Sequence, residues 1–202
     1  RLSEHLQRLL DSALIFGIRN FRYTLEELRE ATFETIRANG FSSCYIRPLI
    51  YLDGPLGLNL DSSEPKVGIA TWEWGTYLGE EALENGVHMM ISSFTRHHIN
   101  ASMTKAKICG NYANSVLAKT LALRSGYDEA IMLDSLGYVS ECSGENLFVV
   151  RAAEICTPPR ATILEGITRD SVTTLARDSG YVVTEDLISR DQLYIADELF
   201  VL

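Results

Sequence analysis

Residues 104–112, TKAKICGNY, hold two of the four lysines of the chain, Lys105 and Lys107, two positions apart. In an extended segment both side chains would point to the same face. A lysine that lies near another cation and away from water loses its proton more easily, and its neutral amine is a nucleophile. The spacing therefore predicts either a reactive lysine or two solvated surface lysines, and it does not choose between them.

The composition narrows the class of protein. A chain of 202 residues with 46% hydrophobic and 22% charged residues is typical of a soluble globular protein of one large or two small domains. The net charge of −9 argues against general binding to nucleic acid or to an anionic membrane. The sequence contains no run of 18 apolar residues and no apolar signal core at its start. We expect neither nucleic acid nor a membrane as a partner.

The cysteines indicate a reducing compartment. Cys44, Cys109, Cys142 and Cys156 are widely separated and form no C-x-x-C pair, which favours reduced cysteines in a cytoplasmic protein over a disulfide framework or a zinc site. The adjacent His97 and His98 would point to opposite faces of a strand. We therefore expect no metal.

The first part of the sequence predicts a small α/β domain over residues 1–81. Thr24 and Glu27 form a capping-box pattern for a helix that ends at Gly40. In the strand predicted next, Tyr45 and Arg47 share a face, and Pro48 indicates an edge or bulged strand. The expected elements are helices at 3–16 and 25–39, strands at 43–51 and 67–74, and a loop at 52–66.

A larger domain is predicted over residues 87–202, after a linker at 82–86. Gly126 and Gly180 are expected helix stops, and Ser189 with Gln192 forms a second capping-box pattern. This mixed order of elements predicts an α+β fold made of two mixed α/β domains. The expected elements are strands at 87–92, 129–133, 138–141, 146–151, 154–157 and 181–187, and helices at 114–124 and 166–180.

Three features match the needs of one cofactor, pyridoxal phosphate. Lys107 offers an amine for an imine, Glu141 offers an acid for a protonated pyridine nitrogen, and residues 166–168 offer free N–H groups at a helix start for a phosphate. Each feature also has a simpler interpretation: surface lysines, a solvated turn acid and an ordinary helix start. Tyr45 and Arg47 could equally form a surface pair on a strand. None of these signals is specific alone.

At these same residues the sequence resembles the fold-type IV pyridoxal-phosphate enzymes, and among them the branched-chain amino acid aminotransferases. The resemblance covers nearly the whole chain, and five motifs follow in the family's order. They are residues 45–49 (YIRPL), 74–79 (WGTYLG), 107–112 (KICGNY), 140–148 (SECSGENLF) and 166–170 (GITRD). The resemblance implies a small N-terminal and a larger C-terminal domain, with pyridoxal phosphate at their junction.

The resemblance also implies roles for individual residues. Lys107 matches the Schiff-base lysine, and Lys105 a neighbour outside the chemistry. Tyr112 matches the phenol that bonds the ring hydroxyl oxygen of the cofactor, and Glu141 the partner of its pyridine nitrogen. The remaining matches are Ile167 and Thr168 at the phosphate, and Tyr45, Arg47 and Tyr77 around the substrate carboxylates.

The implied activity is transfer of the amino group of leucine, isoleucine or valine to 2-oxoglutarate, by a homodimer or an assembly of dimers. The alternatives within the family are D-amino acid aminotransferase, (R)-selective amine transaminase and aminodeoxychorismate lyase. Residues 45–49 and 75–79 favour the branched-chain group. An alternative of another class is a non-catalytic fragment that only folds or dimerises.

Two family features have no counterpart in these 202 residues. The family's phosphate-binding arginine precedes the segment that matches residue 1, and its Gly-Thr-Ala turn follows the segment that matches Leu202. The sequence is therefore expected to be truncated at both ends. Without the charge-assisted arginine contact, we expect the 202-residue chain alone to bind the cofactor weakly or not at all.

Overall fold

The computed structural model describes residues 1–75, 78–79 and 81–202, and the chain divides into two compact units, Arg1–Glu80 and Glu81–Leu202. The sequence places this boundary one residue later. Where it predicts a linker at 82–86, the structure has the short helix α3 (Glu81–Asn85). In the described residues, no helix is long and apolar enough to cross a membrane.

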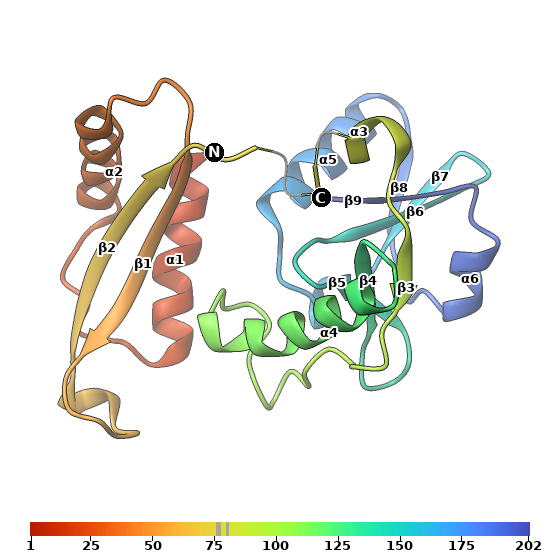
Figure 1. The fold of residues 1–202 in the computed structure, drawn as a ribbon. Helices are drawn as coiled ribbons and strands as arrows, with labels where there is room; N and C mark the ends of the chain where they lie inside the picture. Colours follow the sequence, from red (N-terminus) through yellow and green to blue (C-terminus); the bar gives the residue numbers. More distant parts are fainter. Residues whose placement is uncertain (76–77, 80) are drawn as a thin grey trace. The chain divides into compact units, whose positions relative to one another are not determined.

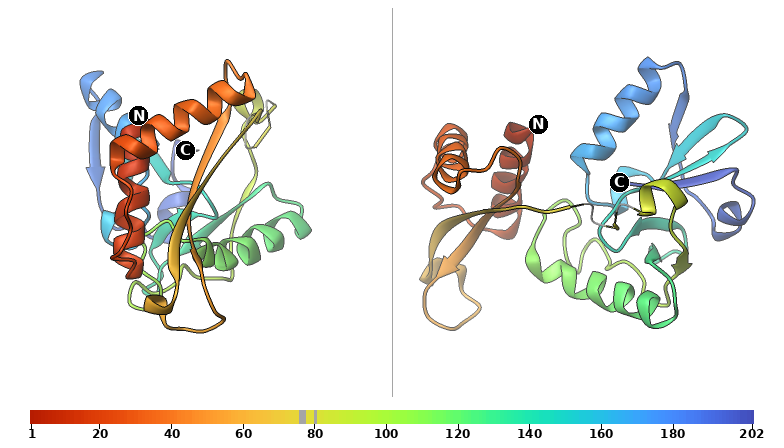
Figure 2. Two further views of the ribbon diagram at one scale, coloured as in Figure 1. Left: turned by 90° about the vertical axis from the view of Figure 1, so that its left-hand side faces the viewer. Right: turned by 45° about the horizontal axis from the view of Figure 1, so that its top comes forward.

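The first unit is a long hairpin with two helices on one face (Figures 1 and 2). β1 (Tyr45–Asp53) pairs antiparallel with β2 (Glu64–Trp72) in an unbroken register. Exposure alternates along β1, so Tyr45 and Arg47 lie on the open face, as predicted, and Ile46 lies on the covered face. The covering helices are α1 (Leu2–Phe16), which contacts β1, and α2 (Leu25–Asn39), which contacts β2.

The sequence located both helices but misjudged the hairpin. The predicted loop at 52–66 is shorter, because β1 continues to Asp53 and β2 begins at Glu64, with only the 3-10 turn η1 (Leu60–Ser62) between them. The pairing of Tyr51 with Lys66 and of Asp53 with Glu64 extends the ladder into that segment. Pro48 lies in a two-stranded sheet without a bulge, so the edge interpretation is the one confirmed.

The second unit contains two small sheets. β3 (Met89–Ile91) runs parallel to β4 (Glu129–Leu133), and β5 (Val139–Cys142) runs antiparallel to β4. The other sheet has the order β8-β7-β6-β9. Its strands are β6 (Leu147–Arg151), β7 (Glu154–Thr157), β8 (Val182–Glu185) and β9 (Glu198–Val201).

Alternating side chains place these two sheets between helices. Ile131 packs in a core with Leu147 and Val149 of the other sheet, whereas Met132 turns to the opposite side. That opposite side is covered by α4 (Tyr112–Arg124). Phe148 likewise turns away from the shared core toward the side covered by α5 (Ile167–Asp178). The short helix α6 (Arg190–Tyr194) contributes Leu193 to the shared core.

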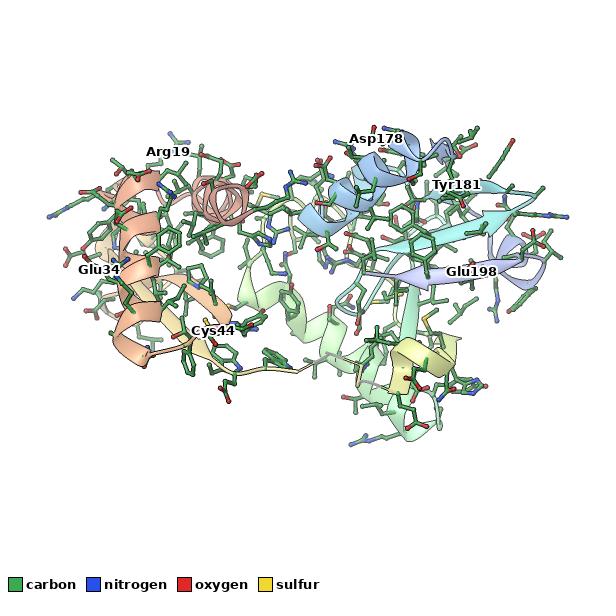
Figure 3. The ribbon with its side chains drawn as sticks, turned by 90° about the horizontal axis from the view of Figure 1, so that it is seen from above. Arg19, Glu34, Cys44, Asp178, Tyr181 and Glu198 are labelled. Atoms are coloured by element: carbon green, nitrogen blue, oxygen red, sulfur yellow. The ribbon has the colours of Figure 1, made fainter. Side chains whose placement is uncertain are left out.

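The ends of these elements follow local signals. Gly126 and Gly180 have positive φ angles of 82° and 89°, just past the last turns of α4 and α5, where the sequence predicts the helix stops. Figure 3 shows Asp178 and Tyr181 together at that end of α5. The strand predicted at 87–92 is only Met89–Ile91 and is half-buried rather than buried.

We predict that Thr24→Ala lowers the free energy of unfolding of the first unit. The Thr24 side chain accepts a hydrogen bond from the backbone N–H of Glu27 at 3.3 Å, and the Glu27 carboxylate accepts one from the backbone N–H of Thr24 at 2.7 Å. Loss of such a cap costs about 1 kcal/mol. Urea denaturation of the variant measures this difference.

Thr35→Ala is the matched control in the same helix. The Thr35 hydroxyl donates to the Ala31 carbonyl within α2 and caps no terminal group. Alanine has a higher helix propensity than threonine, so this variant should unfold at the same urea concentration as the wild type or above it. Equal losses in the two variants would contradict the capping assignment.

Candidate active site

Lys107, Tyr112 and Glu141 line one pocket of the second unit. Arg96, Ser115 and Leu164 complete much of its wall, together with the loop at 142–144. The Lys107 ammonium lies 5.5 Å from the centre of the Tyr112 ring. Tyr112 and Ser115 belong to the first turn of α4, which places them beside the lysine.

The structure distinguishes the two lysines of residues 104–112. Residues 104–106 form a turn, so the expectation of an extended segment with both lysines on one face is wrong. Lys105 Nζ instead donates to the carbonyl oxygens of Arg160 and Ile163, and it lies 3.1 Å from Glu165 Oε1. Lys105 therefore ties the turn to residues 160–165, and only Lys107 of the pair lines the pocket.

Asn111 fixes the turn that precedes Lys107. Its buried side-chain amide donates to the carbonyl oxygens of Ala106 and Met103, at 3.3 and 3.4 Å, and its Oδ1 accepts a hydrogen bond from the Ser102 hydroxyl. Asn111 also ends the 3-10 turn η2 (Cys109–Asn111) that leads into α4. Sequence reasoning assigned this asparagine no role beyond the helix start, because its partners are bonded through a turn that the pattern did not predict.

Glu141 is a buried carboxylate with three donors. Arg96 Nε donates to its Oε1 at 2.5 Å, and Asn146 Nδ2 and the Leu164 N–H donate to its Oε2 at 3.2 and 3.1 Å. Burial raises the pKa of Glu141, and the charges of Arg96 and Lys107 and the Leu164 N–H oppose that rise. The interpretation of Glu141 as a solvated turn acid is wrong.

Arg96 is a pocket residue that sequence reasoning missed. It lies in an irregular segment after β3, where its backbone N–H donates to the Leu133 carbonyl at the end of β4. Its Nη1 lies 2.8 Å from His97 Nδ1, and desolvation and the Arg96 charge lower the pKa of His97 to about 4. His97 is therefore neutral at physiological pH, so that its Nδ1 can accept the arginine proton. Arg96 and Glu141 are 45 positions apart, and no local pattern connects them.

The start of α5 is anchored next to Glu141. Asn146, which donates to Glu141, also donates to the Leu164 carbonyl at 3.0 Å. A Cβ at Gly166 would collide with the Asn146 amide oxygen, so the close approach requires glycine there. No side chain caps this helix start, where Ile167 and Thr168 are the first two residues. The backbone N–H groups of a first helical turn have no partner within the helix and favour an anion.

The predicted substrate residues lie in the first unit. Arg47 Nη2 donates to the Tyr45 hydroxyl at 3.2 Å, and the guanidinium lies over the rings of Tyr45 and Trp72. Both side chains are on the open face of β1. The third predicted residue, Tyr77, lies outside the described residues.

The fold and this lysine-bearing pocket define an α+β protein with the parts of a carbonyl-cofactor site. The model of the family "Amino-transferase class IV" matches residues 1–202. The chain belongs to this family, whose members share the fold-type IV architecture.

Individual relatives give the same family. The branched-chain-amino-acid aminotransferase of Pseudomonas aeruginosa is 48% identical over 202 residues, which are 99% of this chain and 65% of that protein. The chain thus spans just under two thirds of the length of this relative. The crystal structure of the Escherichia coli branched-chain amino acid aminotransferase superposes with a TM-score of 0.97 at 45% identity, over 100% of this chain and 67% of that one.

A third match is the branched-chain aminotransferase of the thermophilic archaeon Thermoproteus uzoniensis, solved with norvaline. It has a TM-score of 0.94 and 44% identity, over 100% of this chain and 67% of that one. Further branched-chain amino acid aminotransferases of the same fold were solved with pyridoxamine 5'-phosphate, with N-(5'-phosphopyridoxyl)-L-glutamate and with 4-methylvaleric acid.

We predict that Arg96→Met is strongly destabilising, because it leaves the Glu141 carboxylate buried without its cation. Removing one partner of a buried ion pair costs about 3–5 kcal/mol. The double variant Arg96→Met/Glu141→Gln removes both charges and should unfold at a higher urea concentration than Arg96→Met. A double-mutant cycle measures the coupling, and strictly additive effects of the two substitutions would contradict a direct pair.

Proposed function

We propose that the protein acts as a pyridoxal-phosphate-dependent aminotransferase on branched-chain amino acids, with 2-oxoglutarate as the amino-group acceptor. The observation that carries the proposal is the convergence of Lys107, Tyr112 and Glu141 on one pocket. Membership of the aminotransferase family and the similarity to branched-chain enzymes support it. Because the chain spans 65% of its curated relative, the activity is proposed for the full-length gene product.

The residues of the pocket fit the cofactor by their chemistry. An aldehyde needs an amine, and Lys107 is the lysine of the pocket. A pyridine ring nitrogen that carries a proton needs a buried acceptor, and Glu141 is a buried carboxyl group held in place by three donors. Tyr112 lies against Lys107, where its phenol would bond the ring hydroxyl oxygen of the cofactor.

The phosphate would lie at the start of α5, on Ile167 and Thr168. This helix has no side-chain cap, and its start is held close to Glu141 through Asn146 and Gly166. A phosphate is favoured there by the backbone N–H groups of the first helical turn and by the helix dipole. The Thr168 side chain is exposed, so its hydroxyl can also reach an anion.

When bound, the cofactor supplies an electron sink for the bond between Cα and hydrogen of the amino acid. Lys107 has two roles: its Nζ holds the cofactor at rest, and then accepts the proton from the substrate Cα and returns it as general base and acid. Glu141 favours the protonated ring nitrogen, because a carboxylate beside that nitrogen stabilises its positive charge. Arg96 in turn favours the ionised form of Glu141.

Tyr45, Arg47 and Tyr77 are proposed to hold the substrate carboxylates. A guanidinium binds a carboxylate through paired N–H groups, so Arg47 is the choice for the distal carboxylate of glutamate. A similar branched-chain enzyme was solved with a phosphopyridoxyl glutamate and with the branched 4-methylvaleric acid, which supports a site for both substrate types. We further propose a cytoplasmic homodimer, or an assembly of dimers; the four free cysteines suit a reducing compartment.

We predict that Lys107→Ala abolishes transamination from leucine to 2-oxoglutarate, because it removes both the covalent anchor and the proton carrier. The assay measures glutamate formed by the full-length gene product, with D-alanine and an (R)-amine tested in parallel. Leucine should be the preferred donor. Faster turnover of D-alanine or the (R)-amine would overturn the proposed substrate class while leaving the enzyme class intact.

Lys105→Ala is the matched control two residues away. This lysine bonds residues 160–165 rather than lining the pocket, so the variant should keep most of the activity and lose some stability. Full activity of Lys107→Ala, in a preparation that shows wild-type folding, would favour the non-catalytic alternative.

A further inference from the structure

Behind one wall of the pocket lies a cluster of buried charged groups that the proposed chemistry does not use. It consists of Glu129 at the start of β4, Lys119 of α4 and Glu145 of the loop between β5 and β6. Glu129 is fully buried and Glu145 is 8% exposed. Burial of ionised carboxylates is costly unless their charges are compensated.

Glu129 connects two sides of the pocket. Its Oε2 lies 2.6 Å from Lys119 Nζ, and its Oε1 accepts hydrogen bonds from the backbone N–H groups of Ala130 and Ser143 at 2.7 and 3.3 Å. Ser143 lines the pocket. Lys119 lies four residues after Ser115, one helical turn from another lining residue.

Glu145 has one bonded and one unbonded oxygen. Its Oε2 accepts a hydrogen bond from the backbone N–H of Gly144, which also lines the pocket, at 3.0 Å. Its Oε1 is buried and has no hydrogen-bond partner. An ionised carboxylate oxygen in that position would be unsatisfied, whereas a protonated one needs an acceptor rather than a donor.

The charges of the cluster balance only with one proton added. The group of Glu129, Glu145 and Lys119 has two acids and one cation, so it is neutral when one acid is protonated. Glu129 receives the lysine and two N–H groups, which favour its ionised form. Glu145 is therefore the acid that keeps the proton, and the Glu129 carboxylate is the acceptor nearest to it in charge and position.

We propose that Glu145 is a positioning residue that stays protonated in the folded protein and shares its proton with Glu129, and that this carboxyl–carboxylate contact holds the 142–145 loop as a wall of the cofactor pocket. The part concerning the cofactor rests on the proposed function. The protonated pair itself does not. Loss of the proton places two carboxylates together in a buried site, and their repulsion acts on the loop that begins next to Glu141.

The titratable groups that face Glu145 come from three elements besides its own loop. Lys119 of α4 lowers the pKa of Glu145, and Glu129 of β4 raises it. Cys142 and Glu141 of β5 belong to the same surroundings, since the charges of Glu145, Glu129, Glu141 and Lys119 all act on the Cys142 thiol. Burial raises the pKa of Cys142 well above its usual value, so this thiol stays neutral.

The pair has a signature in the pH dependence of stability. Desolvation and Glu129 raise the pKa of Glu145 to about 7 in the folded state, against about 4.3 in an unfolded chain. Between these values the folded state holds a proton that the unfolded state has lost, so the stabilisation is present at low pH and declines as the pH rises toward 7. Above that range the two states are equally ionised and no further decline follows from this group.

Glu145→Gln tests this directly in the cofactor-free full-length gene product. The glutamine amide copies the protonated acid, since its oxygen accepts from Gly144 and its NH₂ donates to Glu129 without a titration. The thermal midpoint of the variant, relative to wild type, should be least favourable at pH 5, should increase with pH, and should level off above pH 7. A difference that stays constant from pH 5 to 8.5 would overturn the proposal.

Glu154→Gln is the control, an exposed glutamate of β7 in the same unit. Its midpoint should differ from the wild type by the same amount at every pH. If Glu145→Gln does not fold, the ¹³C carboxyl shift of Glu145 in the wild type decides the question. A titration midpoint near 7 supports the shared proton, and one near 4.5 overturns it.

A second measurement concerns the cofactor. The dissociation constant of pyridoxal phosphate for the wild type should rise several-fold more between pH 6 and 8.5 than that of Glu145→Gln. Equal pH dependence of the two proteins, with the stability signature present, would overturn the link to the pocket wall. No cofactor binding by either protein would instead refute the proposed function and the wall's role in it, and the stability result would still decide whether the pair shares a proton.

Discussion

A buried carboxylate must be surrounded by donors, and the three donors of Glu141 come from three separate segments. Arg96 follows β3, Asn146 precedes β6, and Leu164 precedes α5. Satisfying one negative charge therefore fixes the relative positions of these segments. Because the same carboxylate lines the pocket, the interaction that organises the second unit also places the group proposed to bind the pyridine nitrogen.

The acids on either side of Cys142 differ in the protonation state that their surroundings favour. Glu141 faces a guanidinium and an N–H group, whereas Glu145 faces another carboxylate and shares a single lysine with it. Burial raises the pKa of both, but only Glu141 has a cation of its own. One five-residue stretch thus carries a carboxylate directed at the pocket and a neutral acid behind it, and this difference in partners separates their proposed roles.

The sequence predicted the elements whose signals are local. The capping boxes at Thr24 and Ser189 and the glycine stops lie where the structure has them, because each depends on residues within one helical turn. Strand ends were less accurate, as at Asp53 and Glu64, because ladder pairing decides where a strand ends. The spacing of Lys105 and Lys107 could not separate them, since Lys105 is held by residues 55 to 60 positions away. Motif order selected Lys107, and Arg96 stayed hidden because only the fold brings it to Glu141.

The central claim is that Lys107, and not Lys105, reacts with the aldehyde of the cofactor. The most direct measurement is to incubate the full-length gene product with pyridoxal phosphate, reduce it with sodium borohydride, and map the modified lysine by peptide mass spectrometry. The account predicts a single phosphopyridoxyl group, on the peptide position of Lys107, that is lost when leucine is added before reduction. Modification of Lys105 instead, or an equal spread over the four lysines of the chain, would contradict it.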